Sequence, residues 1–187
     1  MKPLAVLLRT LVFITLPLAV YLALQRFQPR GVALALLVLA LLRSPGRSLA
    51  FLRRHGLYAV PAALVLAALL WRSNDPVWAL AYPVMVNALM LALFGASLLR
   101  PPSLIERLAR LRQPGLPAEG IAYCRRVTQV WCVFFVGNGA VATWTTLAAS
   151  RETWLLYNGL VAYVLMGALF AGEWLYRRRR FGAEAVR

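Results

Sequence analysis

Six long apolar runs, separated by charged residues or by proline and glycine, constrain most strongly what this chain can fold into. They cover roughly residues 4–24, 27–42, 57–71, 76–99, 127–149 and 154–176. A transmembrane helix needs about 20 consecutive apolar residues, with a range of roughly 17–25. The first, fourth, fifth and sixth runs meet this length, and the second and third are shorter. None alternates as a barrel strand does, so each run predicts a helix.

The composition agrees with burial in lipid rather than in a soluble core. Of the 187 residues, 61% are hydrophobic and 14% are charged, whereas a soluble domain has about 45–50% apolar and about 25% charged residues. One core of this length cannot bury so much apolar surface. This excludes a soluble enzyme, a disordered chain and a fibrous repeat. We predict an all-α polytopic transmembrane bundle of six helices, forming a single integral membrane domain over residues 1–187.

The basic residues predict how the bundle is oriented. Nearly all of the 21 lysines and arginines lie in the N-terminus, the second-to-third loop, the fourth-to-fifth loop and the tail; the exceptions are Arg26, Arg30, Arg72 and Arg151. Because loops rich in lysine and arginine stay in the cytoplasm, we predict that both termini are cytoplasmic. The net charge of +15 does not indicate a nucleic-acid partner, since the basic residues sit between apolar runs instead of forming one face.

Residues 100–126 form the longest segment between two spans, a cytoplasmic amphipathic loop in this topology. Ser103 and Glu106 have the spacing of a capping box, and Pro114-Gly115 would stop the helix that follows. Four apolar residues fall on one face of that helix: Leu104, Ile105, Leu108 and Leu111. Three arginines lie elsewhere on it: Arg107, Arg110 and Arg112. We predict a short interfacial helix whose arginines contact anionic lipid headgroups. The alternative is a solvated loop.

Residues with catalytic chemistry are few, and we predict no catalytic, cofactor-binding or metal-binding residues. The one histidine, His55, lies in an arginine-rich loop, and Cys124 and Cys132 do not have the spacing of a zinc or redox motif. No phosphate-binding loop or nucleophile motif is present. Glu173, near the end of the sixth run, lies one helical turn before Arg177. We interpret these two residues as a structural ion pair.

Polar side chains in the last two spans are the other candidates for function. The four that we single out are Gln129, Asn138, Thr143 and Asn158. Polar groups are costly in hydrocarbon unless they have partners. They therefore predict either hydrogen bonds between helices or the lining of a cavity for lipid or solute. The sequence Gly137-Asn138-Gly139 also predicts a local loosening of the fifth helix.

Several short motifs in the second half of the chain carry a resemblance. They are Asn74-Asp75, Pro102 with Leu104-Ile105-x-Arg107, Leu116-Pro117, Trp131-x-x-Phe134-Phe135-x-x-x-Gly139, Trp154, Cys124-Arg-Arg-Val-Thr-Gln-Val-Trp131 and Tyr157-Asn-Gly159. With them, the chain resembles the septation protein A-like bacterial inner-membrane proteins. It is most similar to an uncharacterised branch of predicted membrane proteins associated with aryl-polyene-type gene clusters.

The resemblance implies a multi-pass protein of the bacterial inner membrane with a role in cell-envelope biogenesis or membrane homeostasis. It implies work through a membrane-protein partner or a homodimer, and it supplies no catalytic residue. Our first hypothesis is therefore a non-enzymatic protein that contacts lipids and protein partners, in support of a lipid-linked product. The alternative is a small transporter or flippase that uses the polar faces of the last two helices. An acyl-transfer enzyme is the weakest hypothesis, because His55 has no acidic partner nearby in the sequence.

Overall fold

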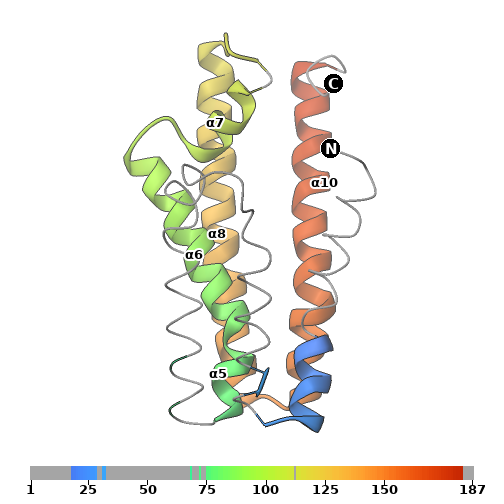
Figure 1. The fold of residues 1–187 in the computed structure, drawn as a ribbon. Coiled ribbons are helices and arrows are strands. Elements are labelled where there is room, and N and C mark those ends of the chain that lie inside the picture. The colour runs from blue at the N-terminus through green and yellow to red at the C-terminus, as the bar shows by residue number, and fades with distance from the viewer. Residues whose placement is uncertain are drawn as a thin grey trace.

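The computed structural model describes residues 18–28, 31–32, 68, 72, 75–111 and 113–182. Most of these residues are helical, and no strand occurs among them. Figure 1 shows α8 (Ala118–Ala148) and α10 (Ala162–Phe181) as long, nearly aligned rods, with α6 (Tyr82–Leu99) tilted beside α8. Three of the described helices are long and apolar enough to cross a membrane: Tyr82–Leu99, Ala118–Ala148 and Arg151–Phe181. They correspond to the fourth, fifth and sixth predicted spans. Most of the first three predicted spans, Arg112 and the chain after Gly182 lie outside the described residues.

The fourth predicted span consists of α5 (Pro76–Leu80) and α6 (Tyr82–Leu99). Asp75 caps α5, because its Oδ1 accepts a hydrogen bond from the Val77 N–H at 2.9 Å. Pro76 suits the first helical position, where its missing N–H costs nothing. The short break at Ala81 precedes Pro83, which has no N–H to continue the helical ladder. Backbone hydrogen bonds nevertheless continue on both sides of Ala81, whose N–H donates to the Val77 carbonyl oxygen at 2.9 Å and whose carbonyl oxygen accepts from the Met85 N–H at 3.1 Å.

The α8 helix (Ala118–Ala148) is longer than the predicted span of 127–149. It begins directly after Pro117, so the end of the predicted loop 100–126 is helical and extends the span at its arginine-rich end. Gly139 allows α8 to approach α6 closely, since a Cβ there would lie 3.2 Å from the Cβ of Asn87. Further along the same contact, Phe94 meets Phe135 edge-on with ring centroids 5.1 Å apart.

The sixth predicted span consists of α9 (Arg151–Leu156), a π-helical segment η2 (Tyr157–Val161) and α10 (Ala162–Phe181). Ser150 starts it, accepting a hydrogen bond from the Thr153 N–H at 3.2 Å. The predicted loosening at Gly137-Asn138-Gly139 is wrong, because α8 is unbroken there. The irregularity lies instead in η2, where the buried Asn158 side chain donates to the Trp154 carbonyl oxygen of the preceding turn at 2.9 Å.

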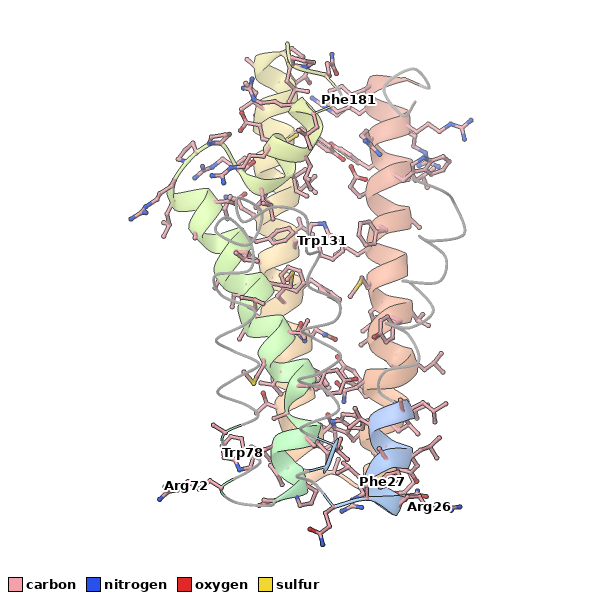
Figure 2. All side chains as sticks on the ribbon, in the orientation of Figure 1. Arg26, Phe27, Arg72, Trp78, Trp131 and Phe181 are labelled. Carbon is pink, nitrogen blue, oxygen red and sulfur yellow. The ribbon has the colours of Figure 1, made fainter. Side chains whose placement is uncertain are left out.

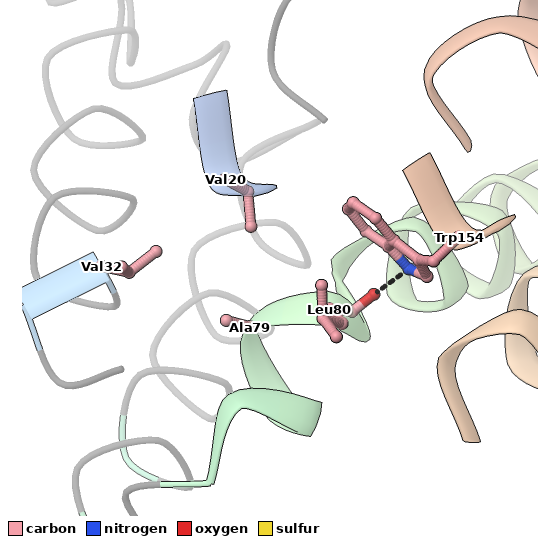
Figure 3. Close-up of a cluster of buried hydrophobic side chains, with 5 residues drawn as sticks. All are labelled: Val20, Val32, Ala79, Leu80 and Trp154. Carbon is pink, nitrogen blue, oxygen red and sulfur yellow. Dashed lines mark hydrogen bonds between the residues drawn. The ribbon is translucent and has the colours of Figure 1, made fainter. Parts of the chain in front are cut away.

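A cluster of buried apolar side chains lies at one end of the bundle (Figure 3). This end holds α5 and the turn at Ser150, and we call it the turn end. Its five buried residues are Val20, Val32, Ala79, Leu80 and Trp154. Trp154 is fully buried, and its indole N–H donates to the Leu80 carbonyl oxygen at 3.1 Å. Elsewhere the long helices expose large apolar side chains, such as Val133 and Leu147, which are 73% and 70% exposed. Such a surface suits lipid rather than water.

Candidate functional site

The end of the molecule opposite the turn end carries most of the described arginines, and we call it the basic end. It brings together α7 (Leu104–Arg110), the start of α8 and the end of α10 (Figure 1). Its described arginines are Arg100, Arg107, Arg110, Arg125, Arg126, Arg177, Arg178, Arg179 and Arg180. Figure 2 labels Phe181 at this end and Arg26 and Arg72 at the turn end. Charge is thus concentrated at one end of the described spans.

The start of α7 is held by a serine that the capping-box pattern did not indicate. Ser103 occupies the cap position, but its side chain makes no capping bond, and its buried hydroxyl has no hydrogen-bond partner in the described chain. Ser97, near the end of α6, accepts from the Leu104 N–H at 2.9 Å instead, and donates to the Phe94 carbonyl oxygen at 2.7 Å. The capping-box prediction is therefore wrong in detail, because Ser103 makes no capping bond and Ser97 on α6 instead accepts from the first N–H of α7.

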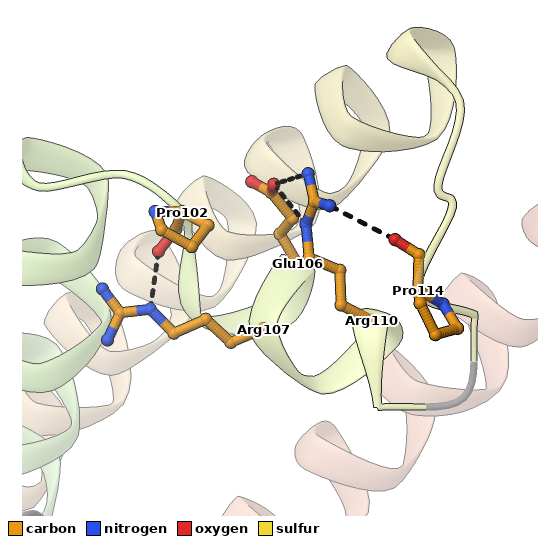
Figure 4. A network of polar contacts seen from close by, with 5 residues as sticks. All are labelled: Pro102, Glu106, Arg107, Arg110 and Pro114. Carbon is orange, nitrogen blue, oxygen red and sulfur yellow. Dashed lines mark hydrogen bonds and ion pairs between the residues drawn. The ribbon is translucent and has the colours of Figure 1, made fainter.

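The two described arginines of α7 bind the protein itself (Figure 4). Arg107 donates to the carbonyl oxygens of Pro102 and Arg100 at 2.8 and 3.1 Å. Arg110 donates through Nε and Nη2 to one carboxylate oxygen of the buried Glu106, at 2.9 and 2.8 Å. These bonds brace the loop between α6 and α8. The predicted headgroup contact of Arg112 lies outside the described residues.

The end of α7 exposes two leucines, Leu108 within the helix and Leu111 directly after it, whereas Leu104 and Ile105 are partly buried. Leu108 is 54% exposed and Leu111 is 81% exposed, while Glu106 is only 6% exposed. A helix end that exposes leucine and buries a paired carboxylate is expensive in water but suits the headgroup region of a bilayer.

A polar network, which we call the asparagine network, joins three helical segments in the middle of the bundle. Asn138 on α8 donates through Nδ2 to Oδ1 of Asn87 on α6, at 3.0 Å. Tyr157 on η2 donates its hydroxyl to Oδ1 of Asn138 at 2.9 Å. The Asn87 amide donates in turn to the Pro83 carbonyl oxygen at 2.8 Å. Both ends of the Asn138 amide group are thus used in contacts with neighbouring helices.

The other polar residues singled out from the sequence have different environments. Asn158 is buried and donates to Thr145 Oγ1 at 3.1 Å and to the Trp154 carbonyl oxygen at 2.9 Å. Thr143 donates to the Gly139 carbonyl oxygen of its own helix at 2.8 Å. Gln129 is exposed on α8. The structure therefore does not gather these residues into one site.

A cavity of about 400 Å³ lies between α8 and α10 at the basic end, and we call it the α8–α10 cavity. Its lining has an apolar part, formed by Ala122, Val127, Val130, Trp131, Leu169 and Gly172. Its polar part consists of Glu119, Tyr123, Arg126, Glu173, Tyr176 and Arg180. Figure 2 shows Trp131 in the space between the two helices. The cavity therefore combines an apolar interior with a charged edge.

Contacts between α8 and α10 bound the cavity at its two ends. The rings of Trp131 and Phe170 meet with centroids 4.6 Å apart on the side toward the membrane centre. Toward the basic end, Tyr123 donates its hydroxyl to Glu173 Oε1 at 3.0 Å and stacks on Tyr176 with centroids 5.9 Å apart.

Two ion pairs lie at the charged edge of the cavity. Arg180 Nη2 donates to Glu119 Oε1. Glu173, predicted to pair with Arg177, has its Oε1 3.4 Å from Arg177 Nε, although that Nε makes no hydrogen bond in the described chain. Glu173 has a second partner across the interface between α8 and α10, because it also accepts from the Tyr123 hydroxyl. The i,i+4 spacing of Glu173 and Arg177 does not indicate this second contact.

No family model, curated protein or solved structure matches the chain. Within the described residues, no group of three or more His, Cys, Asp and Glu side chains is arranged to hold a metal ion. The site therefore consists of an amphipathic cavity beside an arginine-rich end of the described helices.

Proposed function

We propose that this chain is a non-enzymatic, multi-pass protein of the bacterial inner membrane. It supports cell-envelope biogenesis by contacting lipids, and a membrane-protein partner or second copy, at its basic end. The single observation that carries the proposal is the structure of that end, where α7 exposes Leu108 and Leu111 beside a concentration of arginines. Arginines near an anionic leaflet are attracted by about 1 kcal/mol each. The septation protein A-like sequence motifs point the same way.

The transporter or flippase alternative draws less support from the polar residues. A transport path needs polar groups that can exchange their partners for a solute. Asn138 and Asn158, the two residues on which that alternative depends, bond to α6, η2 or other parts of the same bundle. We therefore interpret them as structural contacts between helices.

Complementation of a bacterial strain that lacks the chain tests the proposed role. We expect the deletion to lower the envelope lipid product or detergent tolerance, and the wild-type chain to restore it. Leu111→Glu places a carboxylate where α7 meets the membrane, so we expect it to lose at least half of the restored signal. Gln113→Glu, two residues along the same loop and also exposed, is the matched control and should complement fully at equal protein levels.

Two results would contradict the proposal. One is a deletion strain with an unchanged envelope. The other is turnover of a lipid or acyl substrate by the purified protein, since that would assign an enzymatic role.

A further inference from the structure

We propose that the α8–α10 cavity binds one anionic lipid, with an acyl chain in its apolar part and the phosphate at Arg126. This inference rests on the proposed lipid-contacting function and names the lipid class and the residues that recognise it. Three observations carry it, namely the balance of charge at the edge of the cavity, the shape of its apolar part and its position at the basic end of two membrane-spanning helices.

The charges at the edge of the cavity leave one arginine available. Both carboxylates that line it already face arginines, Glu119 with Arg180 and Glu173 with Arg177. Arg126 lines the same cavity, is exposed, and has no hydrogen-bond or ion-pair partner within the described part of the chain. The uncompensated charge at the edge is thus positive, which favours an anion. A guanidinium matches phosphate oxygens well, because it offers two parallel N–H donors.

The neighbouring arginines differ from Arg126 in this respect. Arg125 donates to the Leu98 carbonyl oxygen at 3.2 Å, away from the cavity lining. Arg178 lies over the Trp174 ring, 5.3 Å from its centroid. Arg126 is therefore distinguished by its place in the cavity rather than by its charge alone.

The apolar part of the cavity fits an acyl chain. Val127, Val130 and Leu169 line it, and Trp131 with Phe170 marks its inner limit. Gly172 contributes no side chain, and a Cβ added there would meet no atom within 4 Å. The volume of about 400 Å³ lies toward the small end of ligand sites, which span roughly 300–1,000 Å³. That space suits a single flexible chain, and a lipid in the surrounding leaflet can reach it without crossing water.

Filling the cavity at Gly172 tests the acyl-chain part of the inference. The purified full-length protein is placed in mixed phosphatidylglycerol and phosphatidylcholine vesicles, with a trace of phosphatidylglycerol that carries a photoactivatable diazirine on one acyl chain. Cross-links are mapped by mass spectrometry of peptides. We expect a preference for 127–131 and 169–172, reduced at least about fivefold by Gly172→Leu. Gly167→Leu is the matched control, because an added Cβ there also meets no atom within 4 Å and the residue does not line the cavity. It should leave the cross-links unchanged.

Removing the charge of Arg126 tests the recognition of phosphate. The same vesicles receive either the diazirine phosphatidylglycerol or a diazirine phosphatidylcholine with identical chains, and inorganic phosphate is added as a competitor in a parallel arm. We expect the wild-type protein to favour phosphatidylglycerol by about fivefold, the preference that one arginine near a charged headgroup supplies. Arg126→Gln should abolish the preference, and Arg179→Gln, an equal charge change outside the cavity lining, should keep it. If inorganic phosphate by itself suppressed the cross-links, the site would be assigned to a free anion. That result would overturn the lipid assignment.

Other outcomes also overturn the inference. Equal labelling of the two lipids would remove the anion preference, and labelling that Gly172→Leu leaves intact would place the chain elsewhere. A photo-cross-linking residue at Val130 that captures another segment of this same protein would make that segment the occupant. Each result is separable from the broader function, because Leu111→Glu and the deletion strain test that function in cells without reference to the cavity.

Discussion

Trp154→Ala is expected to lower the free energy of unfolding by about 3–5 kcal/mol, the cost of truncating a large buried aromatic side chain. Trp154 is fully buried and joins the start of α9 to Leu80 through its indole N–H. It also meets Tyr82 edge-on, with ring centroids 6.0 Å apart. Truncation to alanine would remove the ring and leave a void where α5, α6 and α9 converge. Unfolding of the purified protein by SDS titration in mixed micelles measures the loss.

Two further variants separate packing from a general effect of tryptophan. Trp144 on α8 is 57% exposed, so Trp144→Ala is the matched control, and we expect a change of about 0.5 kcal/mol or less. Trp154→Phe keeps most of the ring and removes the N–H donor. It should cost about 1 kcal/mol, the net worth of the lost hydrogen bond to the Leu80 carbonyl oxygen. An equal loss for Trp144→Ala and Trp154→Ala would contradict the buried cluster.

Asn138→Leu is expected to destabilise the protein by about 1–3 kcal/mol. The substitution keeps a side chain of similar size but removes both interhelical bonds of the asparagine network, the one to Asn87 and the one from Tyr157. It also leaves the Tyr157 hydroxyl without its acceptor. Hydrogen bonds between transmembrane helices average about 0.6 kcal/mol and reach about 1.7 kcal/mol, so the loss of two accounts for this range. The same SDS titration measures it.

Gln129→Leu provides the control on the same helix. Gln129 is exposed on α8, and replacing it with leucine on a lipid-facing surface should be neutral or slightly stabilising. If Asn138→Leu left stability unchanged but abolished export of a pathway product, the network would be a transport element. The structural interpretation of Asn138 would then be wrong.

Hydropathy alone predicts that the described part of the chain is mainly helical. It also predicts the three described helices that are long and apolar enough to span a membrane. The helix limits did not, because charge marks where a span leaves hydrocarbon and not where the backbone stops being helical. Residues 118–126 carry charges such as Glu119 and Arg126, which predict a loop, yet these residues belong to α8. The break at Ala81 before Pro83 and the π-helical η2 depend on local backbone geometry, to which average hydropathy is insensitive.

The candidate site was predicted in part. The sequence pattern points to Asn138 and Asn158 as polar groups that need partners. It does not point to Asn87, the partner of Asn138, because Asn87 is one asparagine among leucines and alanines in the fourth apolar run. The α8–α10 cavity needs α8 to start at Ala118, and its charged edge pairs residues about 50 or 60 positions apart, such as Tyr123 with Glu173. Once α8 is taken to begin at Ala118, lining residues from Glu119 to Val130 fall on one helical face. That face is the signal in the sequence for the α8 side of the cavity.

The direction in which the basic end faces tests the central claim most directly. In a background with Cys124 and Cys132 replaced by alanine, Gln113→Cys marks the α7–α8 loop and Arg151→Cys marks the turn end. Intact cells are treated with a membrane-impermeant maleimide, and lysed cells serve as the reference for full labelling. The account predicts that Arg151→Cys is labelled in intact cells and that Gln113→Cys is labelled only after lysis. Labelling of Gln113→Cys in intact cells would place the basic end outside the cytoplasm and contradict the account.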